Sequence, residues 1–166
     1  MSCGQCAKWR GSTARQYSRR VAGHTFLFRE GNWRAAGEYR DGGGAATPVD
    51  GATRIRHEAG RWVSEGLMTV RRNPPQEHRN RYDIAPFSPG AQSTHWTAEN
   101  ASVGTLNGRF VLAGDTILSF YSSATGRYRG YESMRQVNER RYAVRGAMLD
   151  QDKLISTWVL ELELAP

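Results

Sequence analysis

The stretch from Thr105 to Leu164 most constrains the fold, because it consists of five β-rich runs separated by short turns. The turns contain Gly, Asn or Asp, which tolerate positive φ angles and therefore favour hairpins between consecutive strands. They fall at 113–115, 123–126, 138–140 and 150–152. This succession predicts an antiparallel meander, in which each strand pairs with the next along the chain.

Alternation within these runs indicates which side of the sheet is buried. In the last run Trp158, Leu160 and Leu162 share one face, whereas Glu161 and Glu163 share the other. A sheet with one apolar face must cover that face, either with a second sheet or by closing on itself. We favour closure and expect one all-β, antiparallel up-and-down barrel of about eight to ten strands with little helix.

A weak internal repeat supports the barrel over a flat sandwich. The segments 31–37, 60–66 and 140–146 each place an aromatic residue near the start of a strand and a glycine four positions later on the same face. Glycines within strands mark bends, and an aromatic ring can cover the missing side chain.

The rest of the chain supplies further short strands and looser segments. We expect an early, polar edge strand at 12–20 and further strands at 24–29, 33–40, 52–58, 61–71, 79–85 and 92–97. We also expect a flexible loop at 41–48, and a loop with a turn of helix near 98–103. Segments 72–78 and 85–90 are proline-containing and are candidate lids over the barrel mouth. Residues 1–6 are expected to be a flexible N-terminus that precedes a single barrel domain, 7–166. Cys3 and Cys6 have no second pair to complete a zinc site, so no role is assigned to them.

Composition excludes several classes of protein. Hydrophobic residues make up 39% of the chain, which argues against disorder, and no run approaches the ~20 apolar residues of a membrane-spanning helix. The first residues lack an apolar signal-peptide core, which predicts a cytoplasmic protein. The net charge is +7, but the arginines are scattered singly along strands, so we expect no nucleic-acid partner and rather an attraction for small anions.

One short motif carries a resemblance to a known group. Lys8-Trp9-Arg10-Gly11 resembles the Gly-x-Trp near the start of lipocalins and fatty-acid-binding proteins, the calycin type of barrel, although Ala7 stands where the glycine is usual. The resemblance implies a barrel that encloses a small ligand. Barrels of this shape include intracellular carriers, bilin-chromophore lyases and cofactor-free cyclases, and the fold does not decide between them.

Glu132 is the most informative candidate for chemistry. The phase of its strand places Arg127, Arg129 and Arg135 on the wet face and therefore Glu132 inside the barrel. Burial disfavours the charged form of a carboxyl and raises its pKa, so Glu132 is a candidate general acid or base. A structural role, as a latch to an inward Arg or Tyr, remains the alternative. Tyr128 and Tyr142 are the accompanying catalytic candidates, because a buried hydroxyl could stabilise a developing enolate.

A further set of aromatic and methionine residues is expected to line the interior wall and contact a ligand: Trp33, Tyr39, Trp62, Met68, Phe110, Phe120, Met134, Met148 and Trp158. Plain core packing is the alternative for each. The four histidines are far apart in sequence, and we expect neither a metal site nor a cofactor.

Two functions from different classes follow. The leading hypothesis is a protein that binds a small, largely apolar molecule, anionic or carbonyl-rich, inside the barrel. The alternative is a cofactor-free cyclase, isomerase or lyase that uses the cavity to shape a flexible substrate. A filled structural barrel is the third reading, and a homodimer is left open.

Overall fold

The computed structural model describes residues 23–166, which form a closed antiparallel β-barrel of ten strands. Each strand pairs with its neighbours in sequence, and the last strand pairs with the first. The strands are β1 (Gly31–Asp41), β2 (Ala46–Glu58), β3 (Arg61–Val70), β4 (Gln76–Ile84), β5 (Ser93–Asn100), β6 (Gly104–Ala113), β7 (Thr116–Ser123), β8 (Tyr128–Asn138), β9 (Arg141–Asp150) and β10 (Lys153–Leu164). The predicted all-β, up-and-down barrel is confirmed.

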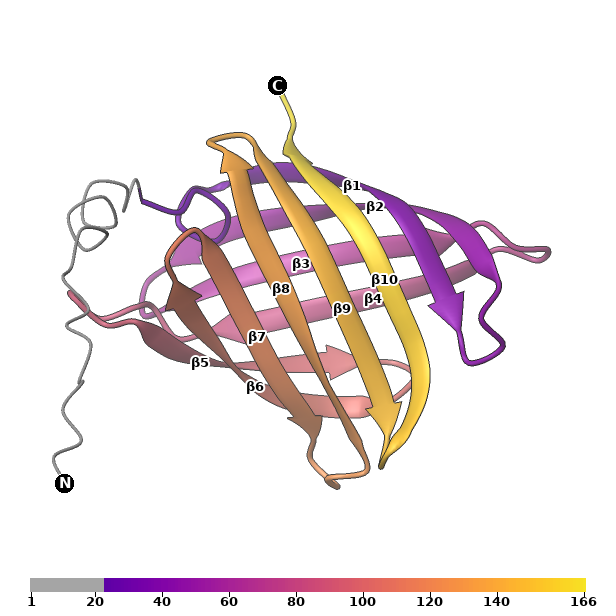
Figure 1. Cartoon of the computed structure of the whole chain (residues 1–166). Helices are drawn as coiled ribbons and strands as arrows, with labels where there is room; N and C mark the ends of the chain where they lie inside the picture. The colour runs from indigo at the N-terminus through magenta and orange to yellow at the C-terminus, as the bar shows by residue number, and fades with distance from the viewer. Residues whose placement is uncertain (1–22) are drawn as a thin grey trace, which may run out of the picture.

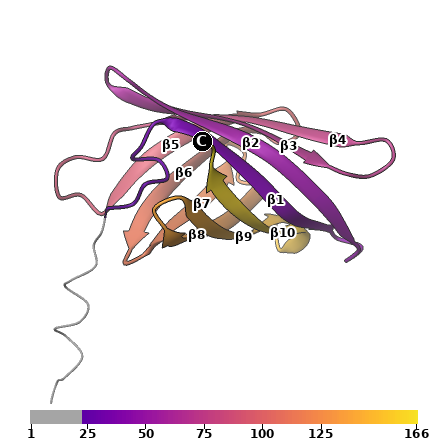
Figure 2. The ribbon, with the colours of Figure 1, turned by 90° about the horizontal axis from the view of Figure 1, so that it is seen from above.

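Pairing of β1 with β10 closes the barrel over a long seam. The register runs from Trp33 opposite Leu164 to Asp41 opposite Ser156, so both strands are paired along nearly their whole length. Closure removes the two free edges that an open sheet would expose. In Figure 1, β7 to β10 cross in front of β2 to β5 at a steep angle, and Figure 2 shows the two walls from above.

Two glycines within strands leave room for tryptophan rings that lie across them. An ideal Cβ at Gly146 of β9 would lie 2.2 Å from the ring of Trp158, and one at Gly108 of β6 would lie 2.2 Å from the ring of Trp96. Each tryptophan stands directly opposite its glycine on the adjacent strand. Rings therefore cover glycines as the repeat predicts, but these rings come from the neighbouring strand, not from four residues earlier on the same strand.

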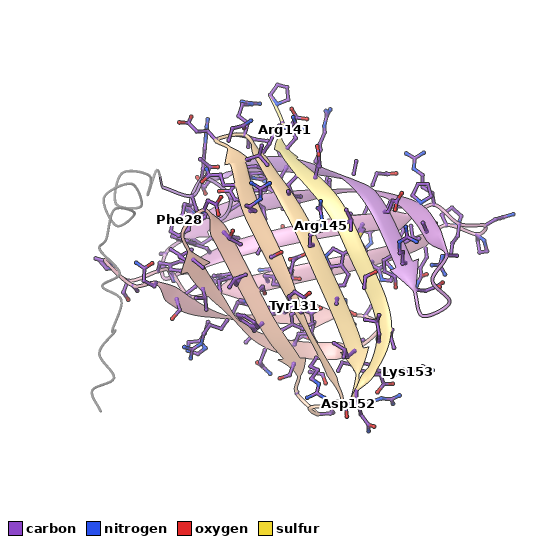
Figure 3. All side chains as sticks on the ribbon, in the orientation of Figure 1. Phe28, Tyr131, Arg141, Arg145, Asp152 and Lys153 are labelled. Carbon is purple, nitrogen blue, oxygen red and sulfur yellow. The ribbon has the colours of Figure 1, made fainter. Side chains whose placement is uncertain are left out.

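One end of the barrel is plugged by the segment that precedes β1. The sequence suggested a strand at 24–29, but the chain makes a turn there and inserts Phe26 and Leu27 into the core, 6% and 1% exposed. The ring of Phe26 meets that of Trp33 edge-on at 5.2 Å. Figure 3 shows Phe28 and Asp152 at opposite ends of the barrel, which we call the plugged end and the far end.

β2 and β4 begin three or more residues earlier than the sequence suggested. β2 starts at Ala46 within the predicted loop, and Pro48 is accommodated because its carbonyl accepts the N–H of Arg71 while its nitrogen has no proton to satisfy. β4 starts at Gln76, directly after the prolines. The prediction of a loop or helical turn at 98–103 is wrong for its first three residues, because β5 continues to Asn100.

The first 22 residues lie outside the described part of the chain. The predictions for the 1–6 terminus, for Cys3 and Cys6, for the early edge strand and for the Trp9 motif fall there. They remain predictions.

Candidate functional site

The barrel interior contains two adjoining cavities. The one nearer the plugged end has a volume of about 150 Å³ and lies under Phe26 and Leu27. The other, nearer the far end, has a volume of about 270 Å³. Both are lined by the same central residues, namely Met68, Asn80, Tyr82, Ser119, Glu132 and Leu160. The cavities therefore meet at the level of Glu132.

Glu132 lies on β8 and points into this interior, where the alternation of its strand predicts it. Its Oε1 accepts a 2.6 Å hydrogen bond from the indole N–H of Trp158 on β10. The two residues are separated by β9, where Gly146 lies opposite both of them, so no side chain intervenes. Burial raises the pKa of the Glu132 carboxyl above its ordinary value, and the indole N–H opposes that rise in part. Burial in this mainly apolar chamber therefore favours the protonated form of the Glu132 carboxyl more than water does.

Two tyrosines that the sequence reasoning missed stand near Glu132. Tyr82 of β4 lines both cavities and Tyr121 of β7 lines the larger one. Burial raises the pKa of each hydroxyl, and the neighbouring Glu132 carboxylate raises it further, so both remain neutral donors at physiological pH. For Tyr82 the signal was present, because Asn80, Tyr82 and Ile84 alternate with Arg79, Arg81 and Asp83.

Tyr121 was missed because the phase of β7 was inverted. Phe120, predicted to line the wall, points outward and is 50% exposed, and this prediction is wrong. Ser119, only 3% exposed, faces the interior in its place, directly opposite Glu132. β7 carries apolar residues on both faces, so alternation alone does not fix its phase.

The far end of the larger cavity carries a second polar group, His78 of β4. Burial and the nearby Arg72 guanidinium lower the pKa of His78, which favours the neutral imidazole. Its Nε2 is buried and has no hydrogen-bond partner among the described residues. The ring centroid of Tyr39 lies 6.1 Å away, and the Arg72 guanidinium lies over the Tyr39 ring.

Six of the predicted wall residues do line the cavities. Phe110 and Met134 line the smaller one, Met68 lines both, and Tyr39, Met148 and Trp158 line the larger one. Trp33 and Trp62 line neither cavity. Trp33 is fully buried in the core of the plugged end, and Trp62 packs there against the rings of His57 and Phe28. Their predicted contact with a ligand is not matched by their placement.

The two tyrosines predicted to be catalytic lie away from the cavity lining. The hydroxyl of Tyr142 accepts hydrogen bonds from the backbone N–H groups of Thr25 and Phe26, at 2.8 and 3.2 Å, and so holds the plug. Tyr128 is at the start of β8, under the Arg127 guanidinium. Neither lines the two interior cavities, so of the three catalytic candidates only Glu132 does.

Other classes of site find no support in the part of the chain that the structure describes. Residues 23–166 contain no group of three or more His, Cys, Asp or Glu placed to hold a metal ion. They also contain no helix with the length and hydropathy needed to cross a membrane.

Comparison with known proteins identifies the architecture. No protein-family model matches this chain, and no curated protein sequence matches it. Among solved structures, the barrel is similar to the S-type phycobiliprotein lyase CPES from Guillardia theta. The TM-score is 0.61 at 10% identity, over 94% of this chain and 98% of that one. The fold is a lipocalin-like, calycin-type barrel.

At 10% identity the likeness establishes the fold alone, and it is compatible with the binding of a small molecule. A second structure, of a proposed AttH protein from Nitrosomonas europaea, aligns with a TM-score of only 0.30 at 13% identity, over 79% of this chain and 49% of that one. That likeness carries no argument.

Proposed function

We propose that this protein binds a small, largely apolar molecule inside the barrel, with a polar group of the ligand held at Glu132. The observation that carries the proposal is the position of Glu132 where the two cavities meet, with one carboxyl oxygen bonded to Trp158. Buried polar groups normally satisfy their hydrogen-bonding capacity. A polar group of a ligand would supply the hydrogen bond for the second carboxyl oxygen of Glu132.

The lining favours a neutral ligand over an anion. The described residues that line the two cavities include a carboxyl, tyrosines, serines and asparagines, but no Lys or Arg. An anion next to Glu132 would meet no compensating cation, and burying an unpaired charge is costly. A carbonyl-rich molecule fits better, because the hydroxyls of Tyr82 and Tyr121 are hydrogen-bond donors. An N–H group fits the carboxyl oxygen equally well.

The size of the cavities bounds the ligand. Pockets for drug-sized molecules measure ~300–1,000 Å³, and the larger interior cavity reaches about 270 Å³. The ligand would therefore be compact, or its binding would require the plug or the far end to move. His78, with its unpartnered Nε2, provides a second polar contact at the far end.

A pair of matched variants tests binding. Ser119→Leu adds bulk between the cavities, whereas Ser122→Leu adds the same bulk to an exposed position of the same strand. We expect an apolar fluorescent probe to bind the native protein and the Ser122→Leu variant, and to bind Ser119→Leu at least tenfold more weakly. Native mass spectrometry of freshly purified protein would identify a co-purified molecule. Absence of both probe binding and a co-purified molecule would refute the proposal.

A second candidate function, a cofactor-free cyclase, isomerase or lyase, is favoured by the raised pKa of Glu132 together with its cavity position. A carboxyl poised in this way can donate or accept a proton at a bound substrate. The neighbouring structure is itself named a lyase, of phycobiliproteins. Glu132→Gln separates the functions: a binding protein keeps its affinity within a few-fold, whereas an enzyme that uses Glu132 loses turnover of the bound molecule but retains its binding.

A further inference from the structure

The outer surface of the barrel carries exposed aromatic residues on one wall only among the described strands. Phe120 of β7 and Tyr131 of β8 lie directly opposite each other and are 50% and 49% exposed. Val159 of β10, on the same wall, is 44% exposed. In Figure 3, Tyr131 and Arg145 lie on this wall, which faces the viewer. Exposed apolar side chains gathered in this way mark an interaction surface more often than isolated ones do.

Three arginines surround these side chains, and none of them forms an ion pair with another described residue. Arg109 lies opposite Phe120 and contacts His95, and Arg145 lies opposite Val159. Arg135 lies opposite Thr116 and Ala143. Arg109, Phe120, Tyr131, Arg135, Arg145 and Val159 together form what we call the arginine–aromatic face.

The wall of β2 to β4 is organised differently. There the cations Arg56, Arg61 and Arg81 alternate with carboxylates in a closed ring of ion pairs that also includes Glu58, Glu65 and Asp83. Val63 lies beneath the ring and is fully buried. The six charges of that ring satisfy one another, whereas the three arginines of the arginine–aromatic face contact only His95 and backbone carbonyls among the described residues and pair with no carboxylate there, so they can bind an external one.

We propose that the arginine–aromatic face is a docking surface for a partner protein that presents carboxylates around an exposed apolar side chain. Phe, Tyr and Arg are enriched in the cores of protein interfaces, where they contribute most of the binding energy. An unpaired guanidinium recognises a carboxylate through two parallel hydrogen bonds. A shallow hollow beside Phe120, bordered by His95, Arg109 and Gly108, could bind the apolar side chain of the partner.

Charge argues against a second copy of this chain as the occupant. A two-fold contact through this face would bring its arginines together, in a protein whose net charge is already +7. Single-stranded nucleic acid is favoured less than protein, because it requires a succession of rings on which bases stack. Here there is one pair of rings, Phe120 and Tyr131, and the next strand places the aliphatic Ala147 opposite Tyr131.

A synthetic peptide with the chemistry inferred for the partner tests this face. The probe is a fluorescein-labelled peptide that alternates glutamate with leucine and tryptophan, and its lysine counterpart is the charge control. We expect anisotropy to report salt-sensitive binding of the acidic peptide only, with hydrogen-exchange protection confined to β6–β9 and the adjacent part of β10.

Two variants localise the binding. Phe120→Ser combined with Arg145→Gln should weaken peptide binding about tenfold or more. Arg54→Gln, an exposed arginine that lies opposite Glu65, should leave it unchanged. Both variants alter outward-facing residues, and urea unfolding verifies that each is folded.

The proposal is overturned if the acidic peptide does not bind, or if the two variants weaken binding equally, since the attraction would then be a diffuse effect of net charge. It is also overturned if a twenty-nucleotide oligothymidine, or vesicles of phosphatidylglycerol and phosphatidylcholine, bind this face more tightly than the peptide. Protection that appears instead in β1 to β4, on the opposite wall of the barrel, would place the peptide away from the arginine–aromatic face and reject the docking surface.

Discussion

Trp158 reaches across a whole strand to bond Glu132. Its indole N–H lies 2.6 Å from the carboxyl oxygen, and the ring crosses β9 at Gly146, where a Cβ would come within 2.2 Å of the ring. The glycine is therefore what allows the hydrogen bond between β10 and β8. This geometry holds the carboxyl in one orientation at the junction of the two cavities.

Gly146→Ala should displace Trp158 and break this hydrogen bond. Overpacking of this kind typically costs ~1–3 kcal/mol of folding free energy, which urea unfolding measures. Gly23→Ala is the control, because an added Cβ there meets nothing within 4 Å. Equal stability of the two variants would show that the Trp158 ring can move aside without cost.

Glu132→Gln should change the pH dependence of stability. Because burial raises the folded-state pKa of Glu132 above its ordinary value of 4.5, the folded protein retains a proton that the unfolded chain releases as pH rises. Native stability attributable to this group is therefore present below pH 4.5 and is lost as pH rises through the folded-state pKa. The melting temperature of the variant, relative to the native protein, should thus increase with pH. Parallel curves for the native protein, for Glu132→Gln and for the exposed-site control Glu77→Gln would contradict the assignment.

His78→Phe should change the pH dependence in the opposite sense. Burial and Arg72 lower the folded-state pKa of His78 below its ordinary value of 6.5. As pH falls below 6.5, the unfolded chain therefore binds a proton at this histidine before the folded protein does. The stability that this group contributes is present above pH 6.5 and is lost as pH falls through the folded-state pKa. Between pH 6.5 and the folded-state pKa, acidification should lower the free energy of unfolding of the variant less than that of the native protein. Urea unfolding at several pH values measures this difference. An unchanged acid slope would show that His78 is solvated in the folded state.

Tyr142→Phe should loosen the plug. Removal of the hydroxyl leaves the part-buried N–H group of Thr25 and the buried one of Phe26 without their acceptor, at a cost of ~1–3 kcal/mol. Tyr131→Phe, which alters an exposed ring, should stay within about 0.5 kcal/mol of the native protein. Hydrogen exchange at residues 24–29 should accelerate in the first variant only. If probe affinity fell while exchange at these residues stayed unchanged, Tyr142 would act on the ligand and not on the plug.

Much of the fold could be predicted because its signals are local. The turns between β6 and β10 follow directly from Gly, Asn and Asp, and the alternation in β8 places Glu132 inside without reference to any other strand. Prediction failed where one strand was ambiguous by itself. In β7 both Ser119–Tyr121 and Leu118–Phe120 are acceptable inner faces, and only pairing with β6 and β8 selects the first.

The sequence by itself determined an antiparallel barrel with a carboxyl in its interior, because side-chain direction in a strand has a period of two residues. Only the tertiary structure decided what surrounds that carboxyl. Trp158, Tyr82 and Tyr121 come from three different strands, and closure of the barrel brings them to Glu132. Tyr142 and Trp33 also point inward, but they contact the plug and not the cavities, since the segment before β1 folds back into one end of the barrel. Contacts across the barrel depend on closure and register, which no single strand specifies.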